Sequence, residues 1–176
     1  MNNNLTTTNQ NSKTALAKSK SLFDITNKLI SKKVTKEILI PYDVWLDPET
    51  KLMWQDDKAV ITIEKQWVTE YNYSKGSHMD TSGDTAATYA NNLLLGGYND
   101  WRLPTKDELV DLYKKKDNLK NVRFGPFRDY WSSTTTEDNI YEAWSVYYGN
   151  SIDVNNTPKD NNHYVRCVRT VNTKSV

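Results

Sequence analysis

The middle of the chain contains a segment with apolar residues at helical spacing. Between Asp84 and Leu95 these residues form one stripe: Ala86, Ala87, Tyr89, Ala90, Leu93 and Leu94. The pair Gly96-Gly97 follows, and glycine adopts at little cost the left-handed dihedrals that commonly end a helix. The pattern therefore predicts a helix from Asp84 to Leu95 that ends at the glycine pair.

A second helix is predicted after Pro104, in the segment TKDELVDLYKKK. Thr105 and Glu108 stand at capping-box spacing, acidic residues occupy the first turn and lysines occupy the last. The side chains expected on its inward face are Leu109, Leu112 and Tyr113. Because the capping residues and the charges agree, we expect this helix to begin directly after Thr105.

Segments rich in β-branched and aromatic residues precede and follow these helices. In EILIPYDVWLDPETKLMWQD two such runs flank a turn-type cluster at 47–50, which predicts a hairpin. The next stretch loses its periodicity after Trp67 and is expected to form a loop around Gly76 and Gly83. Three strand-like segments follow the second helix: FGPFRDYWSSTTT, YEAWSVYYGNSIDVNN and NHYVRCVRTV. This order predicts an α+β fold and excludes a doubly wound one.

The first 41 residues differ in composition from the rest. Residues 1–20 are rich in Asn, Thr, Ser and Lys, and we expect a disordered polar tail there. Residues 21–41 are expected to form an amphipathic helix and a linker; the helix carries Leu22, Phe23, Ile25, Leu29 and Ile30 at near-helical spacing. The chain shows no signal-peptide core and no membrane-spanning run, so we expect a soluble protein without an export signal.

Charge and cysteine content exclude several classes of function. The 176 residues include 23 basic and 22 acidic side chains, without a long block of one sign, so nucleic acid is not an expected partner. Cys167 is the single cysteine, which excludes an internal disulfide and a metal site made of several thiolates. Six Trp and eleven Tyr suit either a core of large rings or a recognition surface.

The stretch GGYNDWRLPTKDEL concentrates unusual residues before the second helix and allows two interpretations. In one it is a ligand loop, where Asn99, Asp100 and Arg102 meet a partner. In the other it is a structural corner, because Pro104 forces the preceding residue toward an extended conformation and the next residue caps the helix. The corner explains more of the residues, and it predicts that Trp101 wedges into the core.

Five motifs in order, WLDPETKLMWQ, GGYNDWRLPTKDEL, YWSST, EAWSVYYGNS and YVRCVR, give the chain a family resemblance. From Tyr42 to Thr170 it resembles the Lcl-like C-terminal domain family of bacterial modules. The resemblance implies a domain at 42–172 with a C-type-lectin-like α+β fold, in which two helices flank a small antiparallel sheet with long loops. It also implies a binding or adhesion module, usually in exported or surface proteins.

The sequence departs from the family pattern at two positions. Lys51 stands where the hairpin turn of the family usually has glycine, which predicts a different turn type here. Ala90 stands where many relatives carry a cysteine, so Cys167 lacks the partner that the resemblance implies. The missing pair weakens the case for an oxidising compartment.

Polar residues between the last strand-like segments are the preferred ligand contacts. The segment 151–162 is expected to be an outward loop without packing duties, and its candidates are Asp153, Asn155, Asn156 and Asp160. We add Asn99, Asp100 and one of the adjacent pair Tyr147 and Tyr148, with Tyr148 as the chosen contact. The acidic spacing fits no EF-hand loop, so neither a metal nor another cofactor is expected.

Two further pairs of residues allow either a functional role or a packing role. Trp131 and Trp144 could stack on a sugar ring, but their strand-like surroundings favour the core. Cys167 and His163 are four residues apart in an apparent strand and could form a nucleophile and base. The apolar neighbours of the thiol favour a buried, inert cysteine instead, and we assign no catalytic residue.

The leading hypothesis is a non-enzymatic recognition or adhesion module that binds a glycan or a protein through surface loops. The alternatives are an enzyme of lectin-like fold, either a hydrolase or an oxidase, and a structural appendage of a larger assembly. A thiol pair, a histidine cluster and paired carboxylates in a catalytic setting are missing from the sequence, which disfavours the enzyme. The sequence leaves the ligand and the oligomeric state open.

Overall fold

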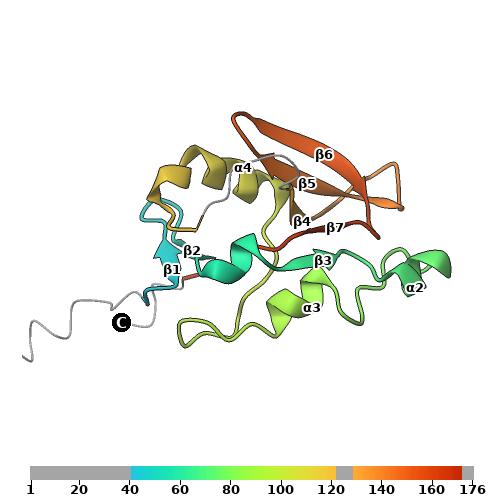
Figure 1. Cartoon of the computed structure of the whole chain (residues 1–176), viewed down its shortest axis with the longest axis horizontal. Coiled ribbons are helices and arrows are strands. Elements are labelled where there is room, and N and C mark those ends of the chain that lie inside the picture. The colour runs from blue at the N-terminus through green and yellow to red at the C-terminus, as the bar shows by residue number, and fades with distance from the viewer. Residues whose placement is uncertain (1–40, 122–128, 172–176) are drawn as a thin grey trace, which may run out of the picture. The chain divides into compact units, whose positions relative to one another are not determined.

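The computed structural model describes residues 41–121 and 129–171, which belong to one structural unit, Ile40–Val176. The predicted polar tail and amphipathic segment lie outside the described residues. One sheet of this unit is three-stranded and antiparallel, in the strand order β1-β2-β8. Figure 1 labels its strands β1 and β2. Its strands are β1 (Val44–Leu46), β2 (Leu52–Gln55) and β8 (Val168–Thr170). The predicted hairpin is confirmed as the β1–β2 pair.

The β1–β2 turn has a lysine where the family resemblance led us to expect glycine. Lys51 adopts a positive φ of 61°, in the left-handed region where a side chain is strained. The carboxylate of Asp47 holds the turn, because it accepts hydrogen bonds from the Glu49 backbone N–H (2.9 Å) and the Thr50 hydroxyl (2.7 Å). The turn therefore keeps a glycine-like backbone despite the lysine.

A five-stranded sheet carries most of the remaining chain, in the order β3-β7-β4-β5-β6. All of its neighbours pair antiparallel except β4 and β7. Its strands are β3 (Glu64–Gln66), β4 (Asp129–Thr135), β5 (Glu142–Tyr148), β6 (Ile152–Pro158) and β7 (Asn162–Tyr164). Strand β6 is an edge strand, so one side of it faces away from the sheet.

The helices are short. They are α2 (Glu70–Ser74), α3 (Ala86–Asn91) and α4 (Lys106–Lys114), with 3-10 turns η1 (Lys58–Ile61) and η2 (Lys116–Asn118). The capping box of α4 is confirmed: the Thr105 hydroxyl accepts from the Glu108 backbone N–H, and the Glu108 carboxylate accepts from that of Thr105. The loop expected around Gly76 is interrupted by α2.

The first predicted helix is confirmed, but its predicted end is wrong. Helix α3 stops at Asn91, well before the glycine pair. Gly96 and Gly97, with φ of 63° and 83°, instead form a tight two-residue turn in which Leu95 and Tyr98 exchange backbone hydrogen bonds. Two positive φ values are what such a hairpin turn requires, and glycine provides them.

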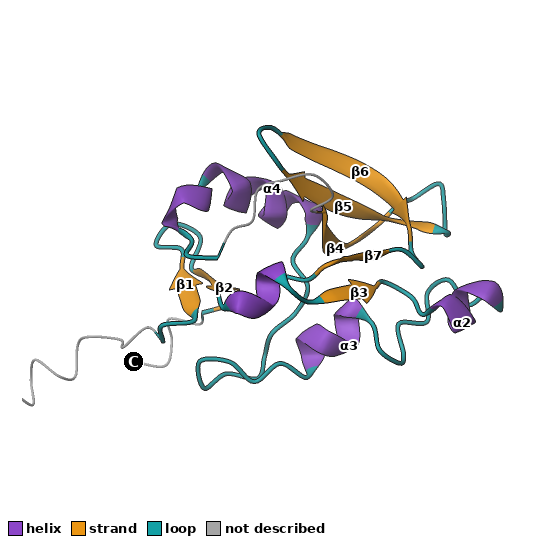
Figure 2. Cartoon of the chain, viewed as in Figure 1, coloured by secondary structure: helices purple, strands orange, loops and turns teal. Residues whose placement is uncertain are grey.

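The predicted fold class is wrong. The described residues form eight strands in two sheets with three short α-helices, and not two helices flanking a small antiparallel sheet with long loops. Figure 2 colours the strands orange and the helices purple. The main reason is the segment 151–162. Its polar composition suggested a loop, yet Ile152–Pro158 pairs with β5 over seven residues. A strand at a sheet edge tolerates polar side chains because much of it faces solvent.

Two hydrophobic clusters hold the sheets and helices together. On one face of the five-stranded sheet, Leu109 and Leu112 of α4 pack with Tyr130, Val146 and Tyr148. The other cluster joins three buried indoles to α3 and to both sheets; its largest members are Trp67, Trp101 and Trp131. Trp131 is fully buried, as predicted.

Candidate functional site

The stretch 99–105 is a corner in which the tryptophan is a core residue. Trp101 is 2 % exposed, and its indole N–H donates to the backbone oxygens of Leu95 (3.3 Å) and Tyr98 (3.2 Å). The prediction that Trp101 wedges into the core is therefore confirmed. Because its N–H is also satisfied inside the protein, the ring has no polar group left for a ligand.

Arg102 joins the corner to the first turn of α4. Its guanidinium donates to both carboxylate oxygens of Glu108, at 2.8 and 2.7 Å. Burial alone would raise the pKa of Glu108, but the hydrogen bonds from Arg102 and from the Thr105 backbone lower it. The Arg102 backbone also pairs with Val168 of β8. Arg102 therefore fastens the helix start to the small sheet.

Asp100, a predicted ligand contact, is engaged in an ion pair. The Arg169 guanidinium donates to its two carboxylate oxygens at 2.6 and 2.9 Å and lies 3.8 Å from the ring centroid of Tyr98. The hydrogen bond from Arg169 lowers the pKa of Asp100. Asn99 beside it is exposed. A ligand role of Asp100 would require this ion pair to open; the roles of both residues stay predictions.

The candidates on β6 separate onto the two faces of the sheet. Asn156 pairs with Trp144 and shares its face, whereas Asn155 and Asp153 pair with Ser145 and Tyr147 on the opposite face. Asn155 donates to Asp129 at 3.1 Å, and the Asp153 carboxylate accepts from the next backbone N–H at 2.9 Å. These residues therefore do not converge on one site.

Two other predicted ligand contacts, Tyr148 and Asp160, form hydrogen bonds within the protein. Tyr148 is fully buried, its hydroxyl donates to the Leu109 backbone oxygen (2.5 Å), and burial raises its pKa. As expected, one tyrosine of the pair faces inward and one is partly exposed, but Tyr147 is the partly exposed one. Asp160 lies in the turn after β6, where its backbone oxygen accepts from Gln66. Tyr148 is not presented to a ligand in this structure.

A cleft of about 390 Å³ lies where the β4–β5 loop meets the start of α4; we call it the Trp144 cleft. It is lined by Lys106, Thr134, Thr135, Thr136, Glu137, Asp138, Asn139, Trp144 and Asn156. Trp144 is partly exposed, so the prediction of a core role for it is wrong. The Lys106 ammonium lies 4.5 Å from the centroid of its indole ring. Of the predicted ligand residues, Asn156 alone lines this cleft.

Several polar side chains of the Trp144 cleft are unpaired within the described part of the chain. The side chains of Thr135, Glu137, Asp138 and Asn156 make no hydrogen bond or ion pair with the described residues, while the Thr134 hydroxyl accepts from the Lys106 backbone. Sequence reasoning missed Glu137 and Asp138. The polar run TTTEDN between two aromatic strands was the available indication, but such a run is typical of any hairpin loop.

The buried cation Lys159 holds the loop that lines this cleft. Its ammonium donates to the backbone oxygens of Ile140 (2.8 Å) and His78 (3.0 Å) and lies 4.7 Å from the ring centroid of Trp67. Burial lowers the pKa of Lys159, and none of the ion pairs among the described residues includes it. Lys159 therefore anchors the β4–β5 loop from inside the protein.

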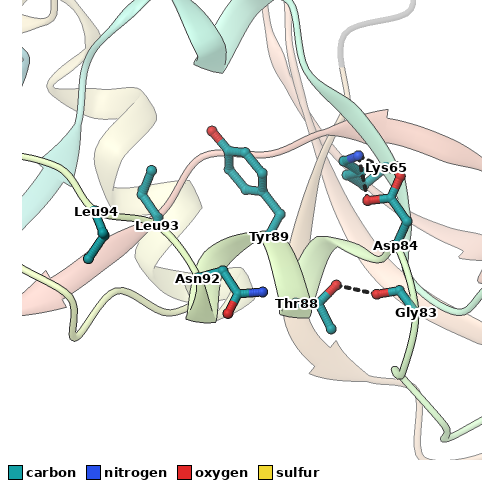
Figure 3. Close-up of a pocket in the computed structure, with 8 residues that line it drawn as sticks. All are labelled: Lys65, Gly83, Asp84, Thr88, Tyr89, Asn92, Leu93 and Leu94. Carbon is teal, nitrogen blue, oxygen red and sulfur yellow. Dashed lines mark hydrogen bonds and ion pairs between the residues drawn. The ribbon is translucent and has the colours of Figure 1, made fainter.

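A second cleft, of about 520 Å³, runs along α3 (Figure 3). Its polar side chains largely contact one another or the core. Lys65 forms an ion pair with Asp84 at 2.6 Å, and the Thr88 hydroxyl donates to the Gly83 backbone oxygen at 2.6 Å. The Tyr89 hydroxyl accepts from Gln55 (3.0 Å). This α3 cleft is larger, but fewer of its groups are left to recognise a polar ligand.

The structure separates the two residues considered as a nucleophile and base. Strand β7 ends at Tyr164 and β8 begins at Val168, so Cys167 and His163 do not share a strand as the sequence suggested. Cys167 is fully buried, and burial raises the pKa of its thiol. The His163 ring packs 4.4 Å from that of Trp131, and burial lowers its pKa. An inert thiol remains our prediction.

Comparison with known proteins establishes the family. The model of the Lcl C-terminal domain matches residues 43–169, so the chain belongs to that family, and the resemblance noted in the sequence is confirmed. No curated protein matches the chain. Within residues 41–121 and 129–171, no helix is long and apolar enough to cross a membrane, and no group of three or more His, Cys, Asp or Glu side chains could hold a metal ion.

Proposed function

We propose that this domain is a non-enzymatic recognition module that binds a glycan in the Trp144 cleft. One observation carries the proposal: a partly exposed indole ring lies in a cleft beside hydrogen-bonding side chains that have no partner among the described residues. Sugars present an apolar ring face and a rim of hydroxyl groups. An aromatic ring and convergent polar groups complement both features.

The described lining of the cleft offers little support for a catalytic role. Its described lining contains neither histidine nor cysteine, and its two carboxylates, Glu137 and Asp138, are neighbours in one exposed loop. General acid–base catalysis by a carboxylate pair instead uses two groups in different environments on either side of the reacting bond. These observations support binding without chemistry.

The proposal is tested with an array of immobilised glycans and the variant Trp144→Ala. We expect the wild-type domain to bind a subset of the array and the variant to lose at least about tenfold in affinity, as for truncation of a central aromatic contact. Tyr71→Ala is the matched control, because Tyr71 is 70 % exposed, has Lys75 over its ring and does not line the cleft. Equal binding by wild type and Trp144→Ala would contradict the proposal.

A further inference from the structure

The rim of the Trp144 cleft carries an excess of negative charge. Glu137 and Asp138 are both exposed and line the cleft, and neither belongs to an ion pair found among the described residues. Lys106 is the single basic residue of the described lining. Two carboxylates against one ammonium give the described lining a net negative charge at neutral pH.

Lys106, the one basic residue of the described lining, lies against the Trp144 ring. The Lys106 ammonium lies 4.5 Å from the Trp144 ring centroid, where the face of the indole attracts it. Lys106 is also the first residue of α4, where a positive side chain opposes the helix dipole. The ammonium therefore lies against the aromatic ring, and the single positive charge it brings is outnumbered by the two carboxylates.

The helix start at this cleft has few backbone donors left for an anion. The Lys106 backbone N–H donates to the Thr134 hydroxyl at 3.0 Å, and the Glu108 backbone N–H donates to the Thr105 hydroxyl at 3.2 Å. Two of the backbone donors that a helix N-terminus presents to a sulfate or carboxylate are thus bonded to threonine side chains.

We infer that the Trp144 cleft selects uncharged glycans and rejects sulfated or carboxylated ones; this inference rests on the proposed function. The carboxylates of Glu137 and Asp138 accept hydrogen bonds from sugar hydroxyl groups, and charged acceptors make the stronger bonds. The side chains of Asn156 and Thr135 supply neutral donors beside them. The same carboxylates repel an anionic polymer, so they give specificity through unfavourable contacts as well as favourable ones.

The test compares each uncharged polymer with its own sulfated derivative, for example dextran with dextran sulfate, and mannan and cellulose oligomers with their sulfates. We expect binding of an uncharged member and at least about tenfold weaker binding of its sulfate, the size of one lost recognition contact. Binding should change less than about twofold between about 0.02 and 0.15 M salt, because the contacts involve no ion pair with the ligand.

The variant Glu137→Gln/Asp138→Asn tests the charges themselves. It should weaken binding of the uncharged glycan, because neutral amides accept hydrogen bonds more weakly than carboxylates. It should also lower the ratio of the affinities for the uncharged glycan and its sulfate at least about fivefold, because the amides do not repel the sulfate groups. The control is Asp43→Asn/Glu70→Gln, which makes the same change in net charge at two exposed residues outside the cleft. This control should bind like the wild type.

The possible failures are distinct. If the sulfates bind best and Trp144→Ala removes that binding, the proposed function stands and the charge selection is wrong. If the two double variants behave alike, the carboxylates do not select and the inference is likewise wrong. If no glycan of either kind binds, or if Trp144→Ala binds as well as the wild type, the proposed function is wrong. The inference that rests on it is then wrong as well.

Discussion

The corner at 99–105 and the Trp144 cleft use similar residues in opposite ways. Both contain a tryptophan, a basic residue and acidic or amide side chains. In the corner, the Trp101 indole, the Arg102 guanidinium and the Asp100 carboxylate all have partners inside the protein. In the cleft, the Trp144 ring is partly exposed, and Glu137 has no partner among the described residues.

This contrast shows that chemically distinctive residues are not by themselves evidence of a ligand site. A guanidinium or carboxylate in a folded protein is first a group whose hydrogen bonds must be satisfied. Where another part of the chain satisfies them, as Glu108 does for Arg102, the group stabilises the fold. Where the chain leaves them unsatisfied at the surface beside an aromatic ring, they are available to a partner.

The largest expected effect is on stability at the corner. Trp101→Ala should lower the free energy of unfolding by about 3–5 kcal/mol, because it removes a buried indole and leaves a cavity. Urea unfolding measures this loss, and glycan binding per folded molecule should be unchanged. If Trp101→Ala kept its stability but lost glycan binding, the result would indicate that the ligand binds at the corner and not in the Trp144 cleft.

A smaller loss is expected at the anchor of the cleft loop. Lys159→Met should cost about 1–3 kcal/mol, because the carbonyls of Ile140 and His78 lose their buried donor. Relative to the wild type, the variant should show faster amide hydrogen exchange at 137–141, and the change should be larger there than in α3. Unchanged exchange in that loop would show that Lys159 does not position the cleft.

The corner and the Trp144 cleft also show what the sequence could and could not predict. The helix start at Thr105, the hairpin near Asp47 and the buried Trp101 follow from local patterns such as capping spacing, a turn cluster and the constraint that Pro104 imposes. The strand β6 and the partial exposure of Trp144 do not follow from such local patterns. Polar residues at 152–158 form a strand because β5 lies beside them, and Trp144 is partly exposed because the β4–β5 loop leaves a cleft at its ring. Pairing and burial of this kind depend on distant residues.

The ion pair between Asp100 and Arg169 should contribute about 1 kcal/mol at neutral pH, since Asp100 is half exposed and the pair is bidentate. Asp100→Asn removes it. Because the folded-state pKa of Asp100 is lowered, its contribution is present above the unfolded pKa of about 3.9 and is lost as pH falls through the folded pKa. The difference between variant and wild type should therefore shrink on acidification. A constant difference down to about pH 2 would contradict the ion pair's role.

The smallest effect on stability is expected at Asn156, which is exposed and unpaired among the described residues. Asn156→Ala should change the free energy of unfolding by no more than about 0.5 kcal/mol while weakening glycan binding. Asn155→Ala is the matched control on the opposite face of β6; it loses a hydrogen bond to Asp129 and should affect stability more than binding. The reverse pattern would place the ligand on the other face of the sheet.

The most direct test of the contrast is an NMR titration of the full chain with the tightest-binding uncharged glycan of the panel, monitoring the indole N–H signals, with Trp144→Phe and Trp101→Phe to assign them. We predict that the Trp144 indole and the Asn156 amide shift with glycan concentration, while the Trp101 indole and the Asp100 amide do not. Saturable shifts at Trp101 and Asp100 with none at Trp144 would contradict the account.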